Sequence, residues 1–355
     1  MYNFFKKIFK SNKKLTSKDS SFLSIYKNTE VSKLFEAISN FNNTTEIRYV
    51  GGCVRKILNQ EDVDDIDLAV TLTPNQIKEC LQTNSIKFFE TGITHGTITA
   101  NIGQKNFEIT SLREDVDTDG RHAKVKYTTD WLKDSSRRDF TINSIYADKD
   151  GNLFDPNGGV KHLEEGRVIF IGNADKRIQE DYLRILRYIR FFISYSNHTH
   201  NSSVKKSIKQ NIAGVANLSK ERLMSELKKI ILSKNFLQLS KESFSLEILT
   251  TIFPQLVNLN NLEKINEYSK NIFYKKTFIF LISYLIIDET DNANYFLFKY
   301  NLSNEDKKRV KFLIENHELF SEKDYFNKKS LQRIFYFYNK SYVIDLLDLK
   351  IFNSK

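Results

Sequence analysis

Residues 47–70 have the sequence IRYVGGCVRKILNQEDVDDIDLAV, and this stretch decides the expected fold of the N-terminal region. The apolar run Ile47–Val50 comes directly before the pair Gly51-Gly52, and a helical stretch follows the pair. A second apolar run, residues 66–70, ends the stretch. The pattern predicts a strand, a glycine turn, a helix and a second strand, which is typical of an α+β domain.

The glycine turn suits the binding of a phosphate group. Because Gly51 and Gly52 have no side chains, backbone N–H groups there can approach an anion closely. Arg55 lies in the first turn of the expected helix, where its guanidinium could brace the same anion. We therefore interpret these three residues as candidate phosphate contacts.

Two aspartates at the second apolar run form a candidate metal site. Asp65 and Asp67 are two residues apart on the expected strand, so their side chains are predicted to project from the same face. Two such carboxylates repel each other unless a cation lies between them, and oxygen ligands suit Mg²⁺. An Asp-x-Asp pair alone is a weak signal, because solvated acidic loops with this pattern are more common than metal sites. The glycine and arginine motif upstream favours the metal site.

Glu108 is the candidate for a third carboxylate, which a two-metal site requires. Its neighbours Phe107 and Ile109 are apolar, so a charged side chain between them on a strand indicates a functional role. The alternative is a glutamate that faces water from an edge strand.

The rest of the chain divides into two regions of different pattern. Before about residue 160, short apolar runs at residues 66–70, 96–101 and 107–112 alternate with helical stretches such as 73–83, which predicts α+β structure. All 12 glycines lie at or before Gly214. A β-rich domain needs turn glycines, so the C-terminal region is expected to be helical. The apolar spacing agrees at Leu223, Leu227, Ile230 and Ile231.

Composition excludes several classes of protein. No apolar run among the 355 residues approaches the roughly 20 residues that span a bilayer, so no membrane association is expected. The two cysteines, Cys53 and Cys80, exclude a disulfide framework and a structural zinc site. The net charge of +10 is concentrated in residues 1–18 and 191–355. These basic regions indicate either a polyanionic partner or a solvated lysine-rich surface.

A second polar motif spans residues 137–143, RRDFTIN. Arg138, Asp139 and Asn143 offer donors and acceptors for a triphosphate and a ribose. The alternative is the start of a helix with Asp139 near its cap. Both interpretations can hold together.

A third motif spans residues 180–190, EDYLRILRYIR. Asp181 and Arg184 are expected on one helix face, where they could offer a base edge both an acceptor and donors. Arg184, Arg187 and Arg190 form a ladder of like charges that an anion nearby would relieve. The alternative is an amphipathic helix with internal ion pairs.

Together, these motifs resemble a known family. GGCVR, DIDLAV, HGTIT, FEITSLR, DTDGRHAKV, SSRRDFTINSI, FDPNGG and RIQEDYLRILRYIRFF occur in this order between residues 47 and 235. They are similar to motifs of the class II tRNA nucleotidyltransferases (CCA-adding enzymes), to which bacterial poly(A) polymerases are closely related. The form of the motifs is nearest to a branch shared by some alphaproteobacteria and eukaryotes.

The resemblance implies a role for each candidate residue. Asp65 and Asp67 match the metal-binding aspartates, and Glu108 matches the third catalytic carboxylate. Asp181 and Arg184 match the protein template that pairs with the incoming base. The whole candidate nucleotide-binding set is Gly51, Gly52, Arg55, Arg138, Asp139, Asn143, Asp181, Arg184, Arg187 and Arg190.

The resemblance also implies a flexible loop and two departures from the family pattern. Residues 113–130 correspond to the loop associated with the switch to ATP, and its candidate residues are Arg113, Asp119, Gly120 and Arg121. Lys56 stands where an aspartate is usual, and Val70 stands where a threonine is usual. Neither change removes a metal ligand.

The implied organisation is α+β, with a nucleotidyltransferase head that contains a small mixed sheet, followed by an all-α neck, body and tail. We expect a basic N-terminal extension at residues 1–25, the head at 26–160, the neck with the template motif at 161–235, and a tRNA-binding body and tail at 236–355. The C-terminal part matches the family weakly and is short.

The implied activity is addition of CCA to the 3′ end of tRNA with CTP, ATP and Mg²⁺, and the basic tail is expected to contact the acceptor and T arms. A poly(A) polymerase or an A-adding enzyme would share nearly all head residues. A non-catalytic RNA-binding relative is a more distant alternative. We expect a cytoplasmic protein, monomeric or homodimeric, and mitochondrial targeting by residues 1–18 is the alternative.

Overall fold

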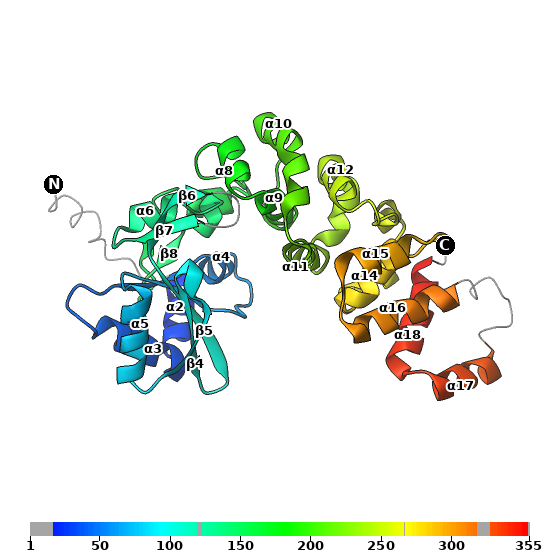
Figure 1. The fold of residues 1–355 in the computed structure, drawn as a ribbon, viewed down its shortest axis with the longest axis horizontal. Coiled ribbons are helices and arrows are strands. Elements are labelled where there is room, and N and C mark those ends of the chain that lie inside the picture. Colours follow the sequence, from blue (N-terminus) through cyan, green and yellow to red (C-terminus); the bar gives the residue numbers. More distant parts are fainter. Residues whose placement is uncertain (1–16, 119–122, 266, 318–326, 354–355) are drawn as a thin grey trace. The chain divides into compact units, whose positions relative to one another are not determined.

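The computed structural model describes residues 17–118, 123–265, 267–317 and 327–353 (Figure 1). Contacts within the chain divide it into two compact units, residues 1–180 and 181–355. Most of the predicted N-terminal extension, residues 1–16, lies outside the described part of the chain. The first described element is helix α2, Ser17–Tyr26.

The first unit is built on a seven-stranded mixed sheet with the order β3-β4-β5-β2-β1-β8-β9. Strands β2 and β5 are parallel, whereas the other neighbouring strands are antiparallel. The strands are β1 (Ile47–Val50), β2 (Asp67–Val70), β3 (Lys87–Gly92), β4 (Thr97–Ile102), β5 (Lys105–Ser111), β8 (Tyr146–Ala147) and β9 (Leu153–Phe154).

Helices pack against this sheet and contribute to its core. Helix α3 (Thr29–Ser39) packs on β1, helix α5 (Pro74–Thr83) packs on β3, β4 and β5, and the two helices contact each other (Figure 1). Helix α5 begins with Pro74, and Oε1 of Gln76 accepts both the backbone N–H and the hydroxyl of Thr73 at 2.9 Å. The helices of this unit are α2, α3 (Thr29–Ser39), α4 (Gly52–Leu58), α5 (Pro74–Thr83), α6 (Trp131–Ser136), α7 (Gly159–Glu164) and α8 (Ala174–Glu180), with 3₁₀ turns η1 (Ile93–His95) and η2 (Thr141–Asn143).

A separate two-stranded hairpin follows β5. Strands β6 (Arg113–Thr118) and β7 (Ala123–Tyr127) are antiparallel, so most of the segment predicted as a loop at residues 113–130 has regular structure. Three of its four candidate residues, Asp119, Gly120 and Arg121, lie outside the described residues.

The predicted α+β pattern of the head is confirmed, with one correction. The apolar runs at residues 66–70, 96–101 and 107–112 overlap strands β2, β4 and β5. However, β2 begins at Asp67, so the prediction that Asp65 shares this strand is wrong. Asp65 lies in the connection from α4, because strand pairing with β1 starts only at Leu68 and with β5 at Asp67.

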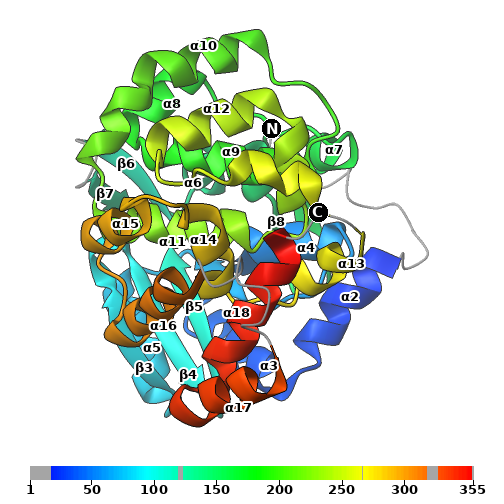
Figure 2. The same ribbon diagram turned by 90° about the vertical axis from the view of Figure 1, so that its right-hand side faces the viewer.

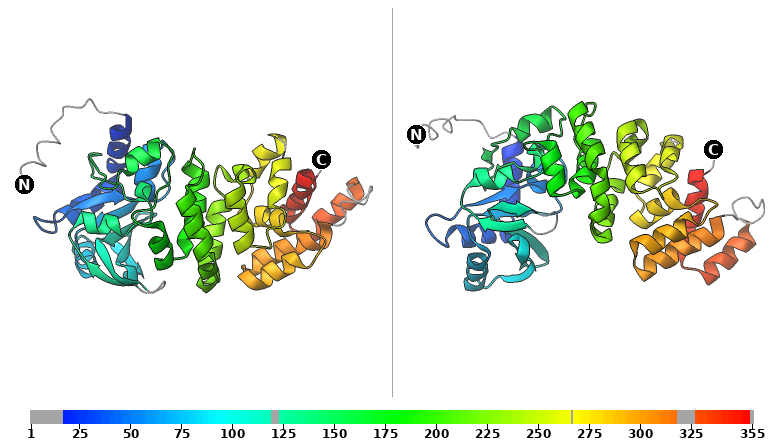
Figure 3. Two further views of the ribbon diagram at one scale, coloured as in Figure 1. Left: turned by 90° about the horizontal axis from the view of Figure 1, so that it is seen from above. Right: turned by 45° about the horizontal axis from the view of Figure 1, so that its top comes forward.

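The second unit contains helices and no strand within its described residues (Figure 3). This confirms the prediction from the missing glycines. The helices are α9 (Leu183–Tyr195), α10 (Ser202–Asn211), α11 (Lys220–Ile231), α12 (Ser243–Ile252), α13 (Glu267–Phe273), α14 (Phe278–Ile286), α15 (Asn292–Tyr300), α16 (Asn304–Asn316), α17 (Lys328–Phe337) and α18 (Lys340–Asn353), with 3₁₀ turns η3 (Ile212–Asn217), η4 (Phe236–Lys241) and η5 (Leu259–Lys264).

Helix α14 forms the centre of the C-terminal half of this unit. All nine of its residues are buried, and α16 packs against both α14 and α18 (Figure 2). A nine-residue helix is much too short for a bilayer. Across the part of the chain that the structure describes, no helix is both long and apolar enough to cross a membrane.

A buried histidine joins three segments of the second unit. His200 stacks on Phe192 of α9, and its Nδ1 lies 3.0 Å from the hydroxyl of Tyr188. Its Nε2 lies 2.7 Å from Oε2 of Glu242 and 3.2 Å from Oγ of Ser245. This polar group therefore ties α9 to the start of α12.

Candidate active site

Asp67 and Glu108 lie side by side at the start of the parallel strand pair β2 and β5, where they are register partners. Asp67 is half-buried and Glu108 is exposed. Strand β5 lies between β4 and β2, so the alternative that placed Glu108 on an edge strand is wrong. An interior strand presents this exposed carboxylate beside Asp67.

The electrostatics of Asp67 indicate a shortage of positive charge. Burial raises the pKa of its carboxyl to about 6, and the negative charges of Glu108 and Asp65 act in the same direction. The guanidinium groups of Arg138 and Arg55 lower this pKa but do not restore the ordinary value of 3.8. A cation bound here would stabilise the ionised carboxylates.

The glycine turn between β1 and α4 passes close to this carboxylate. Gly51 has φ of 70°, a conformation that glycine adopts without strain. A Cβ on Gly52 would lie 3.8 Å from Oδ2 of Asp67, and a Cβ on Gly51 would lie 3.8 Å from Nη1 of Arg138. The backbone of the two glycines therefore lies beside Asp67, the candidate metal ligand, and Arg138, the candidate phosphate ligand.

Arg55 is held by Asn143 of the second polar motif, and Asp139 of the same motif holds Asn143 in turn. The side chain of Arg55 is buried and donates to Oδ1 of Asn143. Asn143 in turn donates to Oδ1 of Asp139 at 2.9 Å, and the same oxygen accepts the backbone N–H of Phe140 at 2.8 Å. Asp139 and Asn143 are buried, so the structure shows them supporting Arg55. Their direct contact with a nucleotide stays a prediction.

Arg138 is held by two residues that sequence reasoning missed. Asp134 of α6 accepts hydrogen bonds from its Nε and Nη2 at 3.2 and 3.0 Å, and the hydroxyl of Tyr146 accepts one from its Nε at 3.0 Å. Asp134 lies only four residues before Arg138, a spacing that signals a helical ion pair. Tyr146 carries no comparable local signal, because strand β8 brings it there.

The predicted template pair differs from expectation in one respect. Helix α8 ends at Glu180 and α9 begins at Leu183, so Asp181 lies in the break between them and does not share a helix face with Arg184. Oδ1 of Asp181 accepts the backbone N–H of Leu183 at 3.1 Å. A short side chain just before a helix commonly caps its free N–H groups, which explains the break.

Asp181 has a second partner that the sequence did not reveal. Arg222 of α11 donates through Nη2 to Oδ2 of Asp181 at 2.8 Å. The two residues are 41 positions apart. Only the packing of α9 against α11 brings them together.

The arginine ladder on α9 is partly neutralised within the unit itself. Arg190 donates to the buried carboxylate of Glu226 at 2.5 Å, and its guanidinium lies 4.1 Å from the ring centre of Phe191. Arg187 lies 5.5 Å from the same ring. For Arg190, the structure supports the alternative of an internal ion pair.

Comparison with known proteins places the chain in a family. Residues 47–169 match the model of the poly A polymerase head domain, and residues 201–259 match that of the probable RNA and SrmB-binding site of polymerase A. The mitochondrial CCA tRNA nucleotidyltransferase 1 of Mus musculus is 41% identical over 278 residues, which are 77% of this chain and 63% of that protein. The chain belongs to the tRNA nucleotidyltransferase and poly(A) polymerase family.

Other members of this family show the same relationship. The Homo sapiens CCA tRNA nucleotidyltransferase 1 is 40% identical over 77% of this chain, and the chain likewise spans 63% of its length. The CCA-adding enzyme of Staphylococcus haemolyticus is 29% identical over 85% of this chain and 72% of its own. The crystal structure of the Bacillus stearothermophilus CCA-adding enzyme in complex with CTP has a TM-score of 0.71 at 20% identity, over 95% of this chain and 78% of that one. This likeness shows that the two proteins share a fold.

The family matches place the candidate residues in different segments. Asp65, Asp67, Glu108 and Arg138 lie within the head match, and Arg222 lies within the RNA-binding match. Asp181 and Arg184 lie in the interval between the two matches.

Proposed function

We propose that this family member adds nucleotides to the 3′ end of tRNA, with CTP and ATP as substrates and pyrophosphate as the leaving group, to complete the CCA end. The observation that carries the proposal is the placement of Asp67 beside Glu108, the glycine turn and two arginines in one head domain. The similarity to named CCA tRNA nucleotidyltransferases supports the choice of CCA addition.

Asp65 and Asp67 fit the role of Mg²⁺ ligands. The raised pKa of Asp67 reflects burial and clustered negative charge, which a divalent cation offsets. In the described part of the chain, no three His, Cys, Asp or Glu side chains form a ready metal-binding group. Mg²⁺ usually takes one or two carboxylates and completes its shell with waters and substrate phosphates, so two aspartates suffice. When bound, Mg²⁺ lowers the pKa of the primer hydroxyl and neutralises charge on the triphosphate.

The remaining head residues bind and orient the triphosphate. Backbone at Gly51 and Gly52 lies open beside Arg138, so an anion there would meet N–H groups and a guanidinium together. Arg55 is fixed by Asn143 and needs no reorganisation when the anion arrives. Such positioning and electrostatic stabilisation supply most of the catalysis in phosphoryl-type transfers.

Base choice is assigned to Asp181 and Arg184. Cytosine and adenine both present an exocyclic amino donor beside a ring-nitrogen acceptor. A carboxylate accepts from the first and a guanidinium donates to the second. Uracil and guanine present a carbonyl at the amino position, so buried polar groups would remain unpaired at about 1–3 kcal/mol each.

A poly(A) polymerase or A-adding enzyme is the second candidate. Both family models carry the name of polymerase A, which supports this alternative directly. The head residues do not separate the two activities, because both need the same metal and triphosphate contacts.

Incubation with defined tRNAs separates these activities. Transcripts that end before CCA, after C and after CC are each incubated with labelled CTP, labelled ATP or both, with Asp67→Asn as the inactive control. A CCA-adding enzyme extends the first transcript to full CCA only with both nucleotides. Incorporation of ATP with no incorporation of CTP on any transcript, in long runs or as one residue after CC, would assign the second candidate. No incorporation on any transcript would overturn the proposal.

We further propose that the reaction takes place in the cytoplasm, because two cysteines without the spacing of a disulfide framework or zinc site are typical of a reducing compartment. The mouse and human relatives are named as mitochondrial, which supports the alternative of targeting by residues 1–18. Fluorescent fusions with and without these residues, in a eukaryotic cell, test the alternative: mitochondrial signal that depends on them would overturn the cytoplasmic assignment.

A further inference from the structure

Asp134 is a fully buried carboxylate in the head that none of the roles above uses. Burial alone raises the pKa of this group, but the guanidinium groups of Arg138 and Arg137 and the hydroxyl of Tyr146 hold it well below the usual range. The carboxylate is therefore ionised at neutral pH, and its charge is balanced by side chains that surround it.

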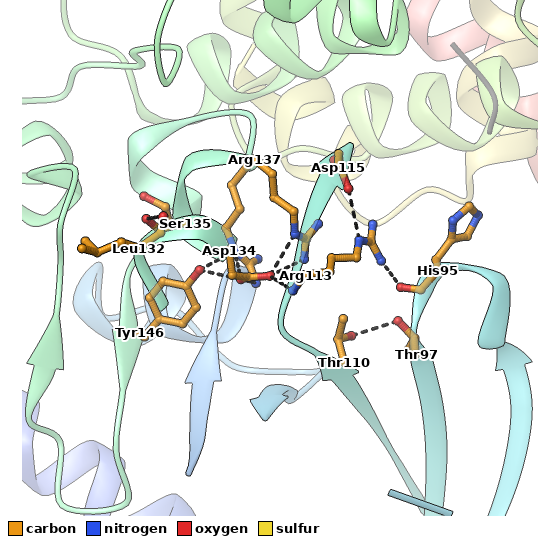
Figure 4. Close-up of polar contacts among 12 residues, drawn as sticks. His95, Thr97, Thr110, Arg113, Asp115, Leu132, Asp134, Ser135, Arg137 and Tyr146 are labelled. Atoms are coloured by element: carbon orange, nitrogen blue, oxygen red, sulfur yellow. Dashed lines mark hydrogen bonds and ion pairs between the residues drawn. The ribbon is translucent and has the colours of Figure 1, made fainter. Parts of the chain in front are cut away.

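The two oxygens of Asp134 have different partners (Figure 4). Oδ2 accepts from Nη2 and Nε of Arg138 at 3.0 and 3.2 Å and from the hydroxyl of Tyr146 at 2.6 Å. Oδ1 accepts from Nε of Arg137 at 2.9 Å and from the backbone N–H of Arg113 at 3.3 Å, and it forms an ion pair with Nη2 of Arg137 at 2.7 Å. One carboxylate thus joins Arg138, Arg137 and the root of the β6–β7 hairpin.

These bonds determine which nitrogen of Arg138 is presented to the glycine turn. Asp134 engages Nε and Nη2, and Tyr146 also engages Nε. The other terminal nitrogen, Nη1, is the one that lies 3.8 Å from the Cβ position of Gly51. A guanidinium is planar, so fixing two of its nitrogens fixes the direction of the third.

Arg113 connects the same carboxylate to a second part of the head. It is the first residue of β6, and its guanidinium donates to the backbone carbonyl of His95 (Figure 4). Burial, together with the positive charge of Arg137, lowers its pKa to about 10. Arg113, at the root of the hairpin, is therefore held through its backbone N–H by Asp134 and through its guanidinium by the carbonyl of His95 in the β3–β4 connection.

We infer that Asp134 is a positioning residue for nucleotide triphosphates: anchored at Arg137 and at the root of the β6–β7 hairpin, it directs Nη1 of Arg138 toward the phosphate position beside Gly51. This inference rests on the proposed function, because it names the group that orients a substrate ligand of that site. Asp134 is buried behind Arg138 and acts through it.

The competing interpretation is that Asp134 serves stability alone. A buried aspartate paired with an arginine stabilises any domain, and loss of one partner leaves an unpaired charge. The second unit contains a matched case: Asp345 is buried and accepts from Nε of Arg309 at 2.5 Å. Asp345→Asn therefore breaks a comparable pair without touching the head.

Steady-state kinetics on the full chain separate the two interpretations. Asp134→Asn, Asp345→Asn and the wild type are compared for KM and kcat with CTP and ATP, and for Tm. We expect Asp134→Asn to raise KM for both nucleotides by about tenfold, the loss typical of a charge-assisted hydrogen bond that no longer orients its partner. We expect Asp345→Asn to lower Tm with KM unchanged.

A double-mutant cycle tests whether the effect passes through Arg138. In the Arg138→Ala background, Asp134→Asn should add less than about twofold to KM, because the residue it orients is gone. An unchanged KM in Asp134→Asn, or the same tenfold effect in both backgrounds, would overturn the inference. If Asp134→Asn does not fold, Tyr146→Phe removes one bond from the same cluster, and a KM increase below twofold there would overturn it. A wild type that incorporates neither nucleotide would instead overturn the proposed function.

Discussion

Asp67 and Glu108 are register partners on the adjacent parallel strands β2 and β5, although 40 residues of sequence lie between them. Their proximity, after burial, is the largest contribution to the raised pKa of Asp67. The parallel pairing therefore creates a concentration of negative charge that neither strand has alone. This relationship is the physical basis for the first two predictions.

Removal of either candidate metal ligand should abolish chemistry and spare RNA binding. Asp65→Ala and Asp67→Ala are expected to reduce incorporation of both CTP and ATP by at least about 10³-fold, because charge stabilisation is the main source of catalysis here. Affinity for tRNA, measured by filter binding, should change less than about threefold. Asp62→Ala, an exposed acid in the same connection, is the control. Near wild-type incorporation by either variant would refute the metal assignment.

Asp67 should also reduce the stability of the metal-free protein. The pKa of its carboxyl is about 6 in the folded state, against the ordinary value of 3.8 in the unfolded chain. Between these pH values the folded protein binds more protons than the unfolded chain, so the free energy of unfolding falls as pH rises through them. At pH 7.5 in EDTA, Asp67→Asn should raise the free energy of unfolding, on the order of 1 kcal/mol after solvent screening. Mg²⁺ should raise the Tm of the wild type and leave that of the variant unchanged. Equal responses of the two proteins to Mg²⁺ would place the cation elsewhere.

Arg222 should affect the choice of base. Its ion pair with Asp181 fixes the carboxylate assigned to the amino group of cytosine and adenine. Arg222→Gln is expected to reduce discrimination against UTP and GTP by about tenfold in kcat/KM, because a mobile carboxylate no longer enforces the acceptor position. Lys229→Gln removes a positive charge from the same helix and serves as the control. Faster use of CTP and ATP with unchanged discrimination would mean that Arg222 blocks the site.

Glu242 should give the second unit an acid-sensitive contribution to stability. Burial alone raises its pKa, but hydrogen bonds from His200 and Ser245 outweigh this and lower the pKa to about 2. A lowered carboxyl pKa stabilises the fold above the ordinary value of 4.5, and this contribution is lost as pH falls toward 2. Urea unfolding at pH 7 and pH 3 should show a difference between wild type and Glu242→Gln that shrinks on acidification. A difference that grows at pH 3 would contradict the sign.

Basic residues of α17 should contribute to salt-dependent tRNA binding. Lys328, Lys329 and Arg333 are exposed, and Tyr336 and Phe337 beside them are 83% and 66% exposed. Neutralising the three cations in the full chain should weaken tRNA binding. It should also make the plot of log affinity against log salt concentration less steep, by about 0.7 to 0.9 for each phosphate that the protein no longer neutralises. The control carries three neutral substitutions of exposed head lysines, Lys87, Lys105 and Lys161. An unchanged slope would exclude α17 from the RNA-binding surface.

The sequence by itself determined the elements and most of the local chemistry. The alternation of apolar runs predicted β2, β4 and β5, and the absence of glycine after Gly214 predicted the helices of the second unit. The positive φ at Gly51 also follows from local chemistry, because glycine is the residue that adopts it freely. These features depend on neighbours within a few positions, which periodicity and residue type report.

Only the tertiary structure decided which of these residues meet. Strand register placed Asp67 beside Glu108, helix packing gave Asp181 the partner Arg222, and the fold enclosed Asp134. It also showed that Asp65 lies outside β2, since the strand begins where pairing with β5 begins. Partners distant in sequence are selected by the free energy of the whole fold, through pairing and burial. Local pattern indicates which charged residues belong to the site, whereas the packed chain determines where the strands and helices that carry them begin and which charge neutralises each one.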